Sequence, residues 1–137
     1  MRNATISGTG SYVPPRVVTN DDLVSQYGID TSHEWVHRRT GINERRFADE
    51  GVGSAELGEH AARRALEAAG LEPHQLDMIV FATLSPEYCF PGSGVMLQQR
   101  LGLCEGPKAR FVPAMDIRNQ CSGFLYGLGT ATSMVQS

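Results

Sequence analysis

The spacing of apolar residues changes along the chain from a helical pattern to a strand-like one and back. Between Ser54 and Ala69 apolar side chains recur at the spacing of one face of an amphipathic helix. Ser54 is a favourable N-cap at the start of this stretch, and Gly70 is a common residue at a helix end. The pattern therefore predicts a helix over residues 54–69.

Two apolar segments further along have the length and composition of strands. Residues 76–82 include an unbroken apolar run, which is typical of a strand buried on both faces of a sheet. The pattern also predicts a strand over 111–117 and helices over 92–101 and 122–137. This alternation of helices and strands predicts an α/β fold with a mixed or parallel sheet covered by helices.

The first part of the chain has shorter signals. Residues 4–8 are moderately β-prone and lead into Gly8 and Gly10, and we interpret them as a strand followed by a turn. A dinucleotide loop is disfavoured because the third glycine of that motif is absent. Residues 19–27 and 30–36 each begin with a capping signal, which predicts two short helices.

The last predicted helix carries no charge. From Asn119 to Ser137 the chain contains no Asp, Glu, Lys or Arg. A helix without a charged face is normally buried on all sides, and a chain of 137 residues cannot easily cover its own last helix. We therefore expect more of the same polypeptide, or a partner, to cover it.

Composition argues against several classes of protein. The chain is 41% hydrophobic and 20% charged with a net charge of -3, which does not favour binding to nucleic acid or to a membrane surface. It has no apolar run of membrane-spanning length and no secretory signal pattern at its start. Its three widely spaced cysteines indicate reduced thiols in a cytoplasmic protein, without a disulfide framework or a metal site.

Cys121 has the clearest chemical potential. It lies where the predicted strand over 111–117 gives way to the predicted helix over 122–137. Unpaired backbone N–H groups and the helix dipole favour a thiolate at such a helix N-terminus. A thiolate at a strand-to-helix turn can act as the nucleophile of covalent catalysis, and the alternative is an inert buried cysteine.

Four segments carry a resemblance to a known family. In chain order they are Gly8-Thr9-Gly10-Ser11-Tyr12-Val13-Pro14, Asp30-Thr31-Ser32-His33-Glu34-Trp35, Arg39-Thr40-Gly41-Ile42 and Cys121-Ser122-Gly123-Phe124. Together they resemble the β-ketoacyl-ACP synthase III group of the thiolase superfamily, along essentially the whole chain. The resemblance implies that residues 1–137 form the N-terminal half of a thiolase-like fold. That half belongs to a layered αβαβα architecture with a mixed sheet and a buried central helix.

The resemblance also implies an activity. In such acyltransferases the cysteine, here Cys121, takes an acyl group from acyl-CoA. Malonyl-ACP then loses carbon dioxide, and the resulting enolate attacks the thioester with help from a His and an Asn of the C-terminal half. The resemblance further implies an acyl carrier protein as partner, a homodimer, a role in fatty-acid or related biosynthesis, and no cofactor besides the acyl-CoA substrate. Neither a nucleic-acid nor a membrane partner is expected.

Trp35 and Arg39 are the candidate CoA-binding residues. They are four positions apart and therefore share one face if the segment is helical. An aromatic ring and a guanidinium at this spacing can hold a flat heterocycle by stacking and cation–π attraction. The resemblance implies that this heterocycle is the adenine of CoA, with Thr31 nearby. The alternative is a tryptophan packed under a surface arginine.

Phe90 matches a family position on a loop that crosses the dimer interface and borders the partner's acyl pocket. Related enzymes that join two fatty acyl chains head to head carry a glutamate there as a base, so phenylalanine favours the decarboxylating reaction. Glu87 keeps head-to-head condensation open as an alternative. A secondary-metabolite starter synthase and a non-catalytic pairing subunit also remain possible, and Phe90 could instead be a core aromatic.

Overall fold

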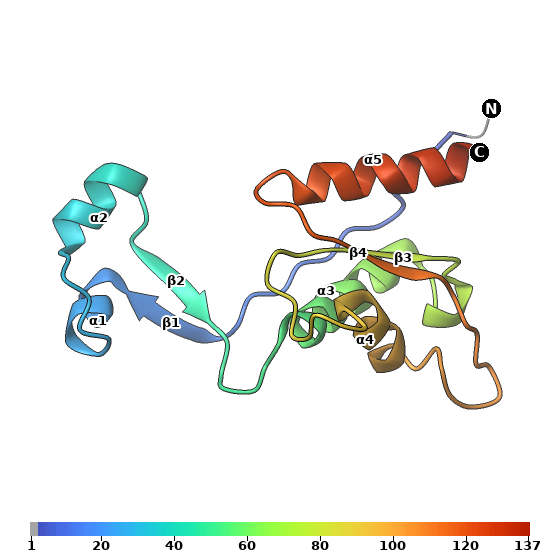
Figure 1. Ribbon diagram of the computed structural model, residues 1–137, viewed down its shortest axis with the longest axis horizontal. Coiled ribbons are helices and arrows are strands. Elements are labelled where there is room, and N and C mark those ends of the chain that lie inside the picture. The colour runs from blue at the N-terminus through green and yellow to red at the C-terminus, as the bar shows by residue number, and fades with distance from the viewer. Residues whose placement is uncertain (1–2) are drawn as a thin grey trace. The chain divides into compact units, whose positions relative to one another are not determined.

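The computed structural model describes residues 3–137, which form two compact units (Figure 1). The larger unit contains the chain up to Tyr12 together with Gly53–Ser137, and the smaller unit is Val13–Val52. Each unit is described by itself below.

The larger unit contains a two-stranded parallel sheet between helices. Strands β3 (Ile79–Ala82) and β4 (Ala114–Ile117) pair in parallel. Helix α5 (Gly123–Gln136) lies on one side of this sheet and α4 (Ser93–Arg100) on the other, with α3 (Ser54–Ala69) packed against α4 (Figure 1). Because α4 connects two parallel strands, β3, α4 and β4 form a βαβ unit, as the sequence pattern predicted.

The core of the larger unit lies on the α4 side of the sheet. One cluster of buried apolar side chains joins α3, β3, α4 and the segments that follow α4. Its members are Leu66, Ile79, Leu97, Leu101, Leu103 and Val112. Each such side chain contributes about 1.5 to 3 kcal/mol when it is fully buried. At the rim of the cluster, Arg100 of α4 pairs with Glu56 and Glu59 of α3 at 3.0 and 3.4 Å.

Helices α3 and α4 also meet at their first residues. Helix α3 has the predicted bounds, but its N-cap is Gly53 and not Ser54. The hydroxyl of Ser54 instead lies 2.9 Å from the hydroxyl of Ser93, the first residue of α4. The predicted cap residue therefore joins the N-termini of two helices.

The predicted strand over residues 4–8 is wrong. The segment is not in a strand: Gly8 lies against α3, and residues 4–6 line a groove with α5. A Cβ added at Gly8 would overlap the carbonyl oxygen of Ala65, and one at Gly10 would overlap that of Ala61. The two glycines thus allow one backbone to lie directly against a helix, a non-local contact that a strand-and-turn interpretation misses.

The smaller unit is an antiparallel strand pair with two helices between the strands. Strands β1 (Arg16–Thr19) and β2 (Glu44–Phe47) were not predicted, whereas helices α1 (Asn20–Ser25) and α2 (His33–Thr40) were. Both helices begin with the expected side-chain caps, and the hydroxyl of Ser32 accepts a hydrogen bond from the third N–H of α2 at 3.1 Å.

A buried asparagine joins the parts of the smaller unit. Asn20 is completely buried, and its Nδ2 donates to the carbonyl oxygen of Ile42 at 2.8 Å. Its Oδ1 accepts from Nη2 of Arg45 at 2.6 Å, and Nη1 of Arg45 donates to the carbonyl oxygen of Val18 at 3.1 Å. These bonds fix the start of α1 to β2 and to the turn that follows α2.

The other predicted helices and strands are confirmed, but the two strands are shorter than predicted. Strand β3 covers the end of the predicted 76–82 and β4 the end of 111–117, while α4 and α5 begin within one residue of their predicted starts. A single 3-10 turn, Pro73–Gln75, precedes β3. No helix within residues 3–137 is long and apolar enough to cross a membrane.

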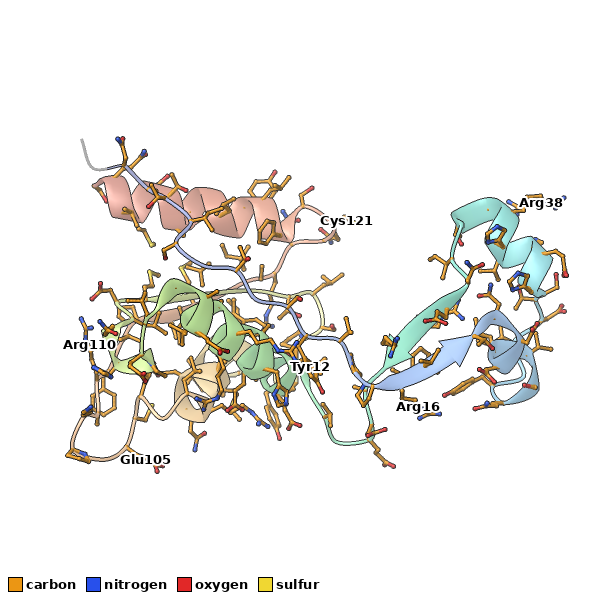
Figure 2. The ribbon with its side chains drawn as sticks, turned by 180° about the vertical axis from the view of Figure 1, so that it is seen from behind. Tyr12, Arg16, Arg38, Glu105, Arg110 and Cys121 are labelled. Carbon is orange, nitrogen blue, oxygen red and sulfur yellow. The ribbon has the colours of Figure 1, made fainter. Side chains whose placement is uncertain are left out.

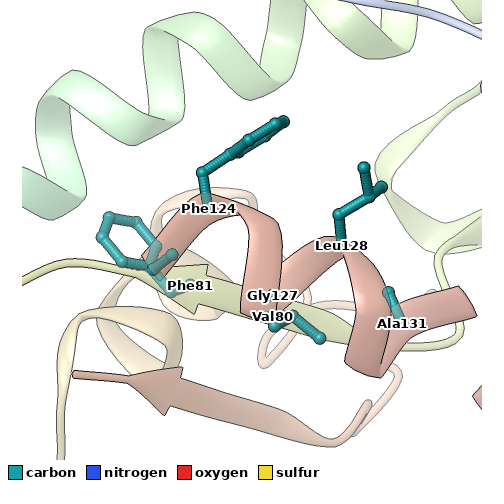
Figure 3. Close-up of a pocket in the computed structure, with 7 residues that line it drawn as sticks. Val80, Phe81, Phe124, Gly127, Leu128 and Ala131 are labelled. Atoms are coloured by element: carbon teal, nitrogen blue, oxygen red, sulfur yellow. The ribbon is translucent and has the colours of Figure 1, made fainter. Parts of the chain in front are cut away.

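Helix α5 is only partly covered within the described chain. Its buried residues are Gly123 and Gly127, which lie against Ala82. An open apolar groove of about 360 Å³ runs between α5 and β3, with Phe124 and Leu128 projecting from the helix (Figure 3). Several large apolar side chains of α5 are exposed: Phe124, Leu125, Tyr126, Leu128, Met134 and Val135. The chain therefore does not bury its last helix, and what covers that helix stays a prediction.

Candidate functional site

Cys121 lies in a short turn between β4 and α5, which we call the cysteine turn (residues 118–122). Strand β4 ends at Ile117, and α5 begins at Gly123. The thiol is exposed at the N-terminal end of α5 (Figure 2). The predicted strand-to-helix turn is present, and within the described chain the thiol of Cys121 is not buried.

The start of α5 leaves backbone donors available near this thiol. The N-cap residue, Ser122, makes no side-chain cap bond, so its hydroxyl does not occupy the first N–H groups of the helix. Within the turn, the N–H of Gly123 donates to the carbonyl oxygen of Gln120 at 2.9 Å. Unpaired N–H groups and the positive end of the helix dipole stabilise an anion at such a position.

Phe90 lies on the segment between β3 and α4, which we call the Phe90 loop (residues 83–92). Its side chain is 89% exposed within the described chain, which does not pack it as a core aromatic. Glu87 of the same loop is half-buried and lies against the backbone of Gly53, where an added Cβ would overlap its carboxylate. The carboxylate is therefore packed at the start of α3.

Two residues that the sequence interpretation missed hold the Phe90 loop to the end of β4. The carboxylate of Asp116 accepts hydrogen bonds from the N–H groups of Ser93 and Gly94 at 2.9 and 2.7 Å. Nη2 of Arg118 donates to the carbonyl oxygen of Cys89 at 2.7 Å. The available signal was the position of both residues just before Cys121, but their partners are more than twenty residues away in the sequence.

The structure brings Trp35 and Arg39 together on one face of α2, as predicted. The guanidinium carbon of Arg39 lies 4.8 Å from the centroid of the Trp35 ring, and the tryptophan is 49% exposed. This arrangement matches the alternative of a tryptophan under a surface arginine. A heterocycle held between them needs about 7 Å between the two planes, so the Arg39 side chain must move before a ring can enter.

Thr31 has unused hydrogen-bonding capacity. Its Oγ1 is buried and has no hydrogen-bond partner within residues 3–137. It precedes Ser32, the N-cap of α2, and so lies just before the helix that carries Trp35. A buried hydroxyl without a partner carries a free-energy penalty of about 1 to 3 kcal/mol, which a ligand group could remove.

The last turn of α2 is basic. It contains His37, Arg38 and Arg39, and Arg38 is labelled in Figure 2. The His33 and His37 rings stack with their centroids 5.7 Å apart. The two arginine cations oppose the negative end of the helix dipole and so stabilise the helix whether or not they meet a ligand.

The predicted site residues fall into two groups. Cys121 and Phe90 belong to the larger unit, and Thr31, Trp35 and Arg39 belong to the smaller one. No cluster of three or more His, Cys, Asp or Glu side chains that could hold a metal ion occurs in the described part of the chain.

Parallel strands between helices, with a cysteine where a strand leads into a helix, form an α/β scaffold of the kind that the thiolase resemblance implies. No protein-family model matches the chain. A β-ketoacyl-[acyl-carrier-protein] synthase III from Neisseria meningitidis is 44% identical over all 137 residues, which make up 41% of that protein. The chain is thus similar over its whole length to β-ketoacyl-ACP synthase III, and the family resemblance predicted from its motifs is confirmed.

Solved structures agree with this likeness. The 3-oxoacyl-[acyl-carrier-protein] synthase III from Aquifex aeolicus VF5 is 44% identical with a TM-score of 0.83, over 96% of this chain and 40% of that one. The priming β-ketosynthase from the R1128 polyketide biosynthetic pathway is 34% identical with a TM-score of 0.87, over 99% of this chain and 38% of that one. The chain therefore spans about two fifths of the length of its relatives.

Proposed function

We propose that residues 1–137 form the N-terminal half of a condensing enzyme of the β-ketoacyl-ACP synthase III type. In this proposal Cys121 accepts an acyl group from acyl-CoA. The observation that carries it is an exposed cysteine at the uncapped start of α5, in a chain 44% identical over its whole length to such a synthase.

The chemistry follows from the position of the thiol. The Cys121 thiolate attacks the carbonyl carbon of the acyl-CoA thioester, the bond to the CoA sulfur breaks, and CoA leaves as a thiolate that takes up a proton. Backbone N–H groups at the start of α5 stabilise the negative charge that develops on the carbonyl oxygen. In the second half-reaction malonyl-ACP loses carbon dioxide, its enolate attacks the Cys121 thioester, and the cysteine leaves as a thiolate.

The smaller unit supplies the CoA-binding residues in this proposal. The Arg39 side chain first moves away from Trp35, and adenine stacks on the tryptophan ring. The Arg39 guanidinium then covers the face of the adenine that points away from Trp35. The unpartnered Thr31 hydroxyl gains a hydrogen bond to the nucleotide. No cofactor takes part, since the acyl-CoA is itself the substrate.

The proposal includes the assembly and its surroundings. The exposed Phe90 borders the acyl pocket of a partner in a homodimer, and an acyl carrier protein delivers the malonyl group. The enzyme initiates fatty-acid or related biosynthesis in the cytoplasm, where the free thiols of Cys89, Cys104 and Cys121 remain reduced.

Intact-mass measurement after incubation with acyl-CoA tests the proposal. We expect a mass increase equal to one acyl group in the wild-type full-length protein and none in Cys121→Ala. Cys89→Ala is the matched control, because Cys89 is also an exposed thiol in the larger unit, and this variant should still be acylated. A wild-type protein that stays unmodified would contradict the proposal and favour the non-catalytic pairing subunit.

A second candidate is a starter synthase of secondary metabolism. The 34% identity and TM-score of 0.87 to a priming β-ketosynthase favour it. Condensation rates with malonyl groups on carrier proteins from fatty-acid and polyketide synthesis would distinguish the two. Head-to-head condensation is less favoured because Phe90 lacks a basic group and Glu87 is packed against Gly53.

A further inference from the structure

Both ends of the Phe90 loop are fastened to the last residues of β4. At its start, the N–H of Thr83 donates to the carbonyl oxygen of Ile117 at 3.2 Å. At its end, the Asp116 carboxylate accepts from the N–H of Ser93 at 2.9 Å, and the side chain of Asp116 is only 11% exposed. The ends of the loop are therefore fixed to the strand that leads into the cysteine turn.

The middle of the loop depends on Arg118. Nη2 of this residue donates to the carbonyl oxygen of Cys89 at 2.7 Å and lies 3.4 Å from that of Tyr88. The same nitrogen lies 3.9 Å from Oδ2 of Asp116, so the guanidinium is held between a carboxylate and the loop. One side chain of the cysteine turn thus contacts the loop next to Phe90.

The tip of the loop has little apolar packing to hold it otherwise. Tyr88, Cys89 and Phe90 are all exposed. A segment with few buried contacts takes its position from its polar bonds and opens easily when they are lost. Within the described chain, the bond from Arg118 to the Cys89 carbonyl is therefore the side-chain contact that holds the tip.

We propose that Arg118 is a positioning residue that sets the acyl-chain selectivity of transfer to Cys121 of the partner subunit. It does so by fixing the Phe90 loop to the end of β4. The inference rests on the proposed function, in which Phe90 borders the acyl pocket of the partner in a homodimer. A loop tip released from Arg118 moves the pocket wall, which changes the fit of long and short acyl chains differently.

The geometry of the guanidinium predicts how substitutions rank. Arginine carries several N–H groups in a rigid plane and can serve the loop and Asp116 together, whereas the lysine ammonium is a compact charge on a flexible stem. Arg118→Lys should therefore keep part of the function, and Arg118→Met should lose it. The lysine variant tests whether a charged donor partly rescues the position of the loop.

Arg110 offers a matched control in the same unit. Its Nη1 donates to the carbonyl oxygen of His74 at 3.3 Å, and its other terminal nitrogen pairs with Asp77. Its side chain is 47% exposed, against 38% for Arg118. Arg110 lies in a different part of the unit from Cys121, as Figure 2 shows. Arg110→Met removes an equivalent arginine without touching the Phe90 loop.

The experiment measures the rate of Cys121 acylation in the full-length protein with acyl-CoAs of increasing chain length. We expect Arg118→Met to change the ratio of long-chain to short-chain rates by about tenfold, the low end of the discrimination given by one methylene in a pocket. Arg118→Lys should change it less, and Arg110→Met should leave it unchanged. General destabilisation lowers all rates together and does not move the ratio.

Two outcomes overturn the inference. The first is an unchanged chain-length ratio in Arg118→Met when the wild-type protein is acylated. The second outcome applies if the wild-type protein is acylated by none of the acyl-CoAs. In that case the proposed function fails, and the attachment of the loop is tested by amide hydrogen exchange of residues 84–91. Faster exchange in Arg118→Met than in Arg110→Met supports fastening of the loop by Arg118, and equal exchange overturns it.

Discussion

Replacing Asn20 with leucine tests how the smaller unit holds the helix that carries Trp35. The substitution keeps the size of the side chain and removes a hydrogen bond to the carbonyl oxygen of Ile42 and one from Arg45. It also removes a longer contact, at 3.4 Å, between Nδ2 of Asn20 and Nδ1 of His33. Ile42 and Arg45 follow α2 in the sequence, and His33 is its first residue. The loss of these contacts should loosen the attachment of α2 to the strand pair.

The magnitude follows from the types of bond. A buried carbonyl left without its donor destabilises the fold by about 1 to 3 kcal/mol, and a hydrogen bond to a charged group contributes about 1.5 to 3 kcal/mol. Arg45 keeps its bond to Val18, and the leucine recovers some apolar packing in a completely buried position. We therefore expect a net loss of about 2 to 3 kcal/mol, roughly a 30- to 150-fold increase in the local opening constant.

Amide hydrogen exchange measures this constant directly. The N–H groups of β1, β2 and α2 should exchange faster by that factor in Asn20→Leu, while those of β3 and β4 should keep their wild-type rates. Asn43→Leu is the matched control, because Asn43 is exposed and accepts from Asn20 only through its backbone. An increase below about fivefold in the smaller unit would refute the reasoning, since one orphaned carbonyl alone predicts more.

Three further predictions concern other parts of the chain. Gly10→Ala should lower the free energy of unfolding by about 2 kcal/mol or more in denaturant titrations, through overlap with Ala61, whereas Gly129→Ala meets open space and should not. Burial raises the pKa of Glu59, but hydrogen bonds from its two arginine partners outweigh this and hold it below the usual value of 4.5. Its contribution to stability should therefore be present above that value and be lost as pH falls through the lower folded pKa, and Glu59→Gln should flatten this part of the unfolding profile. Trp35→Ala should raise KM for acyl-CoA about tenfold, since stacking on a base contributes about 1 to 3 kcal/mol, without changing turnover of acyl-pantetheine, which lacks adenine.

Elements specified by local signals could be predicted from the sequence. The helix over 54–69 has an apolar face and a glycine stop within its own residues, and α2 has its cap at Ser32. The strand-to-helix turn at Cys121 could be predicted because the strand before it and the helix after it each have a local pattern. In each case the residues that specify the element lie within it or directly beside it in the sequence.

Features that depend on distant partners could not be predicted. Strand β2 has the sequence Glu-Arg-Arg-Phe, which lacks an apolar run and becomes a strand by pairing with β1. The segment over 4–8 has a strand-like composition, but Gly8 lies against α3 and residues 4–6 line a groove with α5. Asp116 and Arg118 escaped notice for the same reason, since their hydrogen-bond partners lie before α4 or at its start.

The contact between Ser54 and Ser93 has an electrostatic consequence. It brings together the N-termini of α3 and α4, each of which carries about half a positive charge, so the two ends repel one another. Asp116 on the first N–H groups of α4 and Glu87 beside Gly53 supply the opposite charge. The carboxylates of Asp116 and Glu87 thus offset the positive charge at the N-termini of α3 and α4. The Phe90 loop, which contains Glu87, leads directly into the N-terminus of α4.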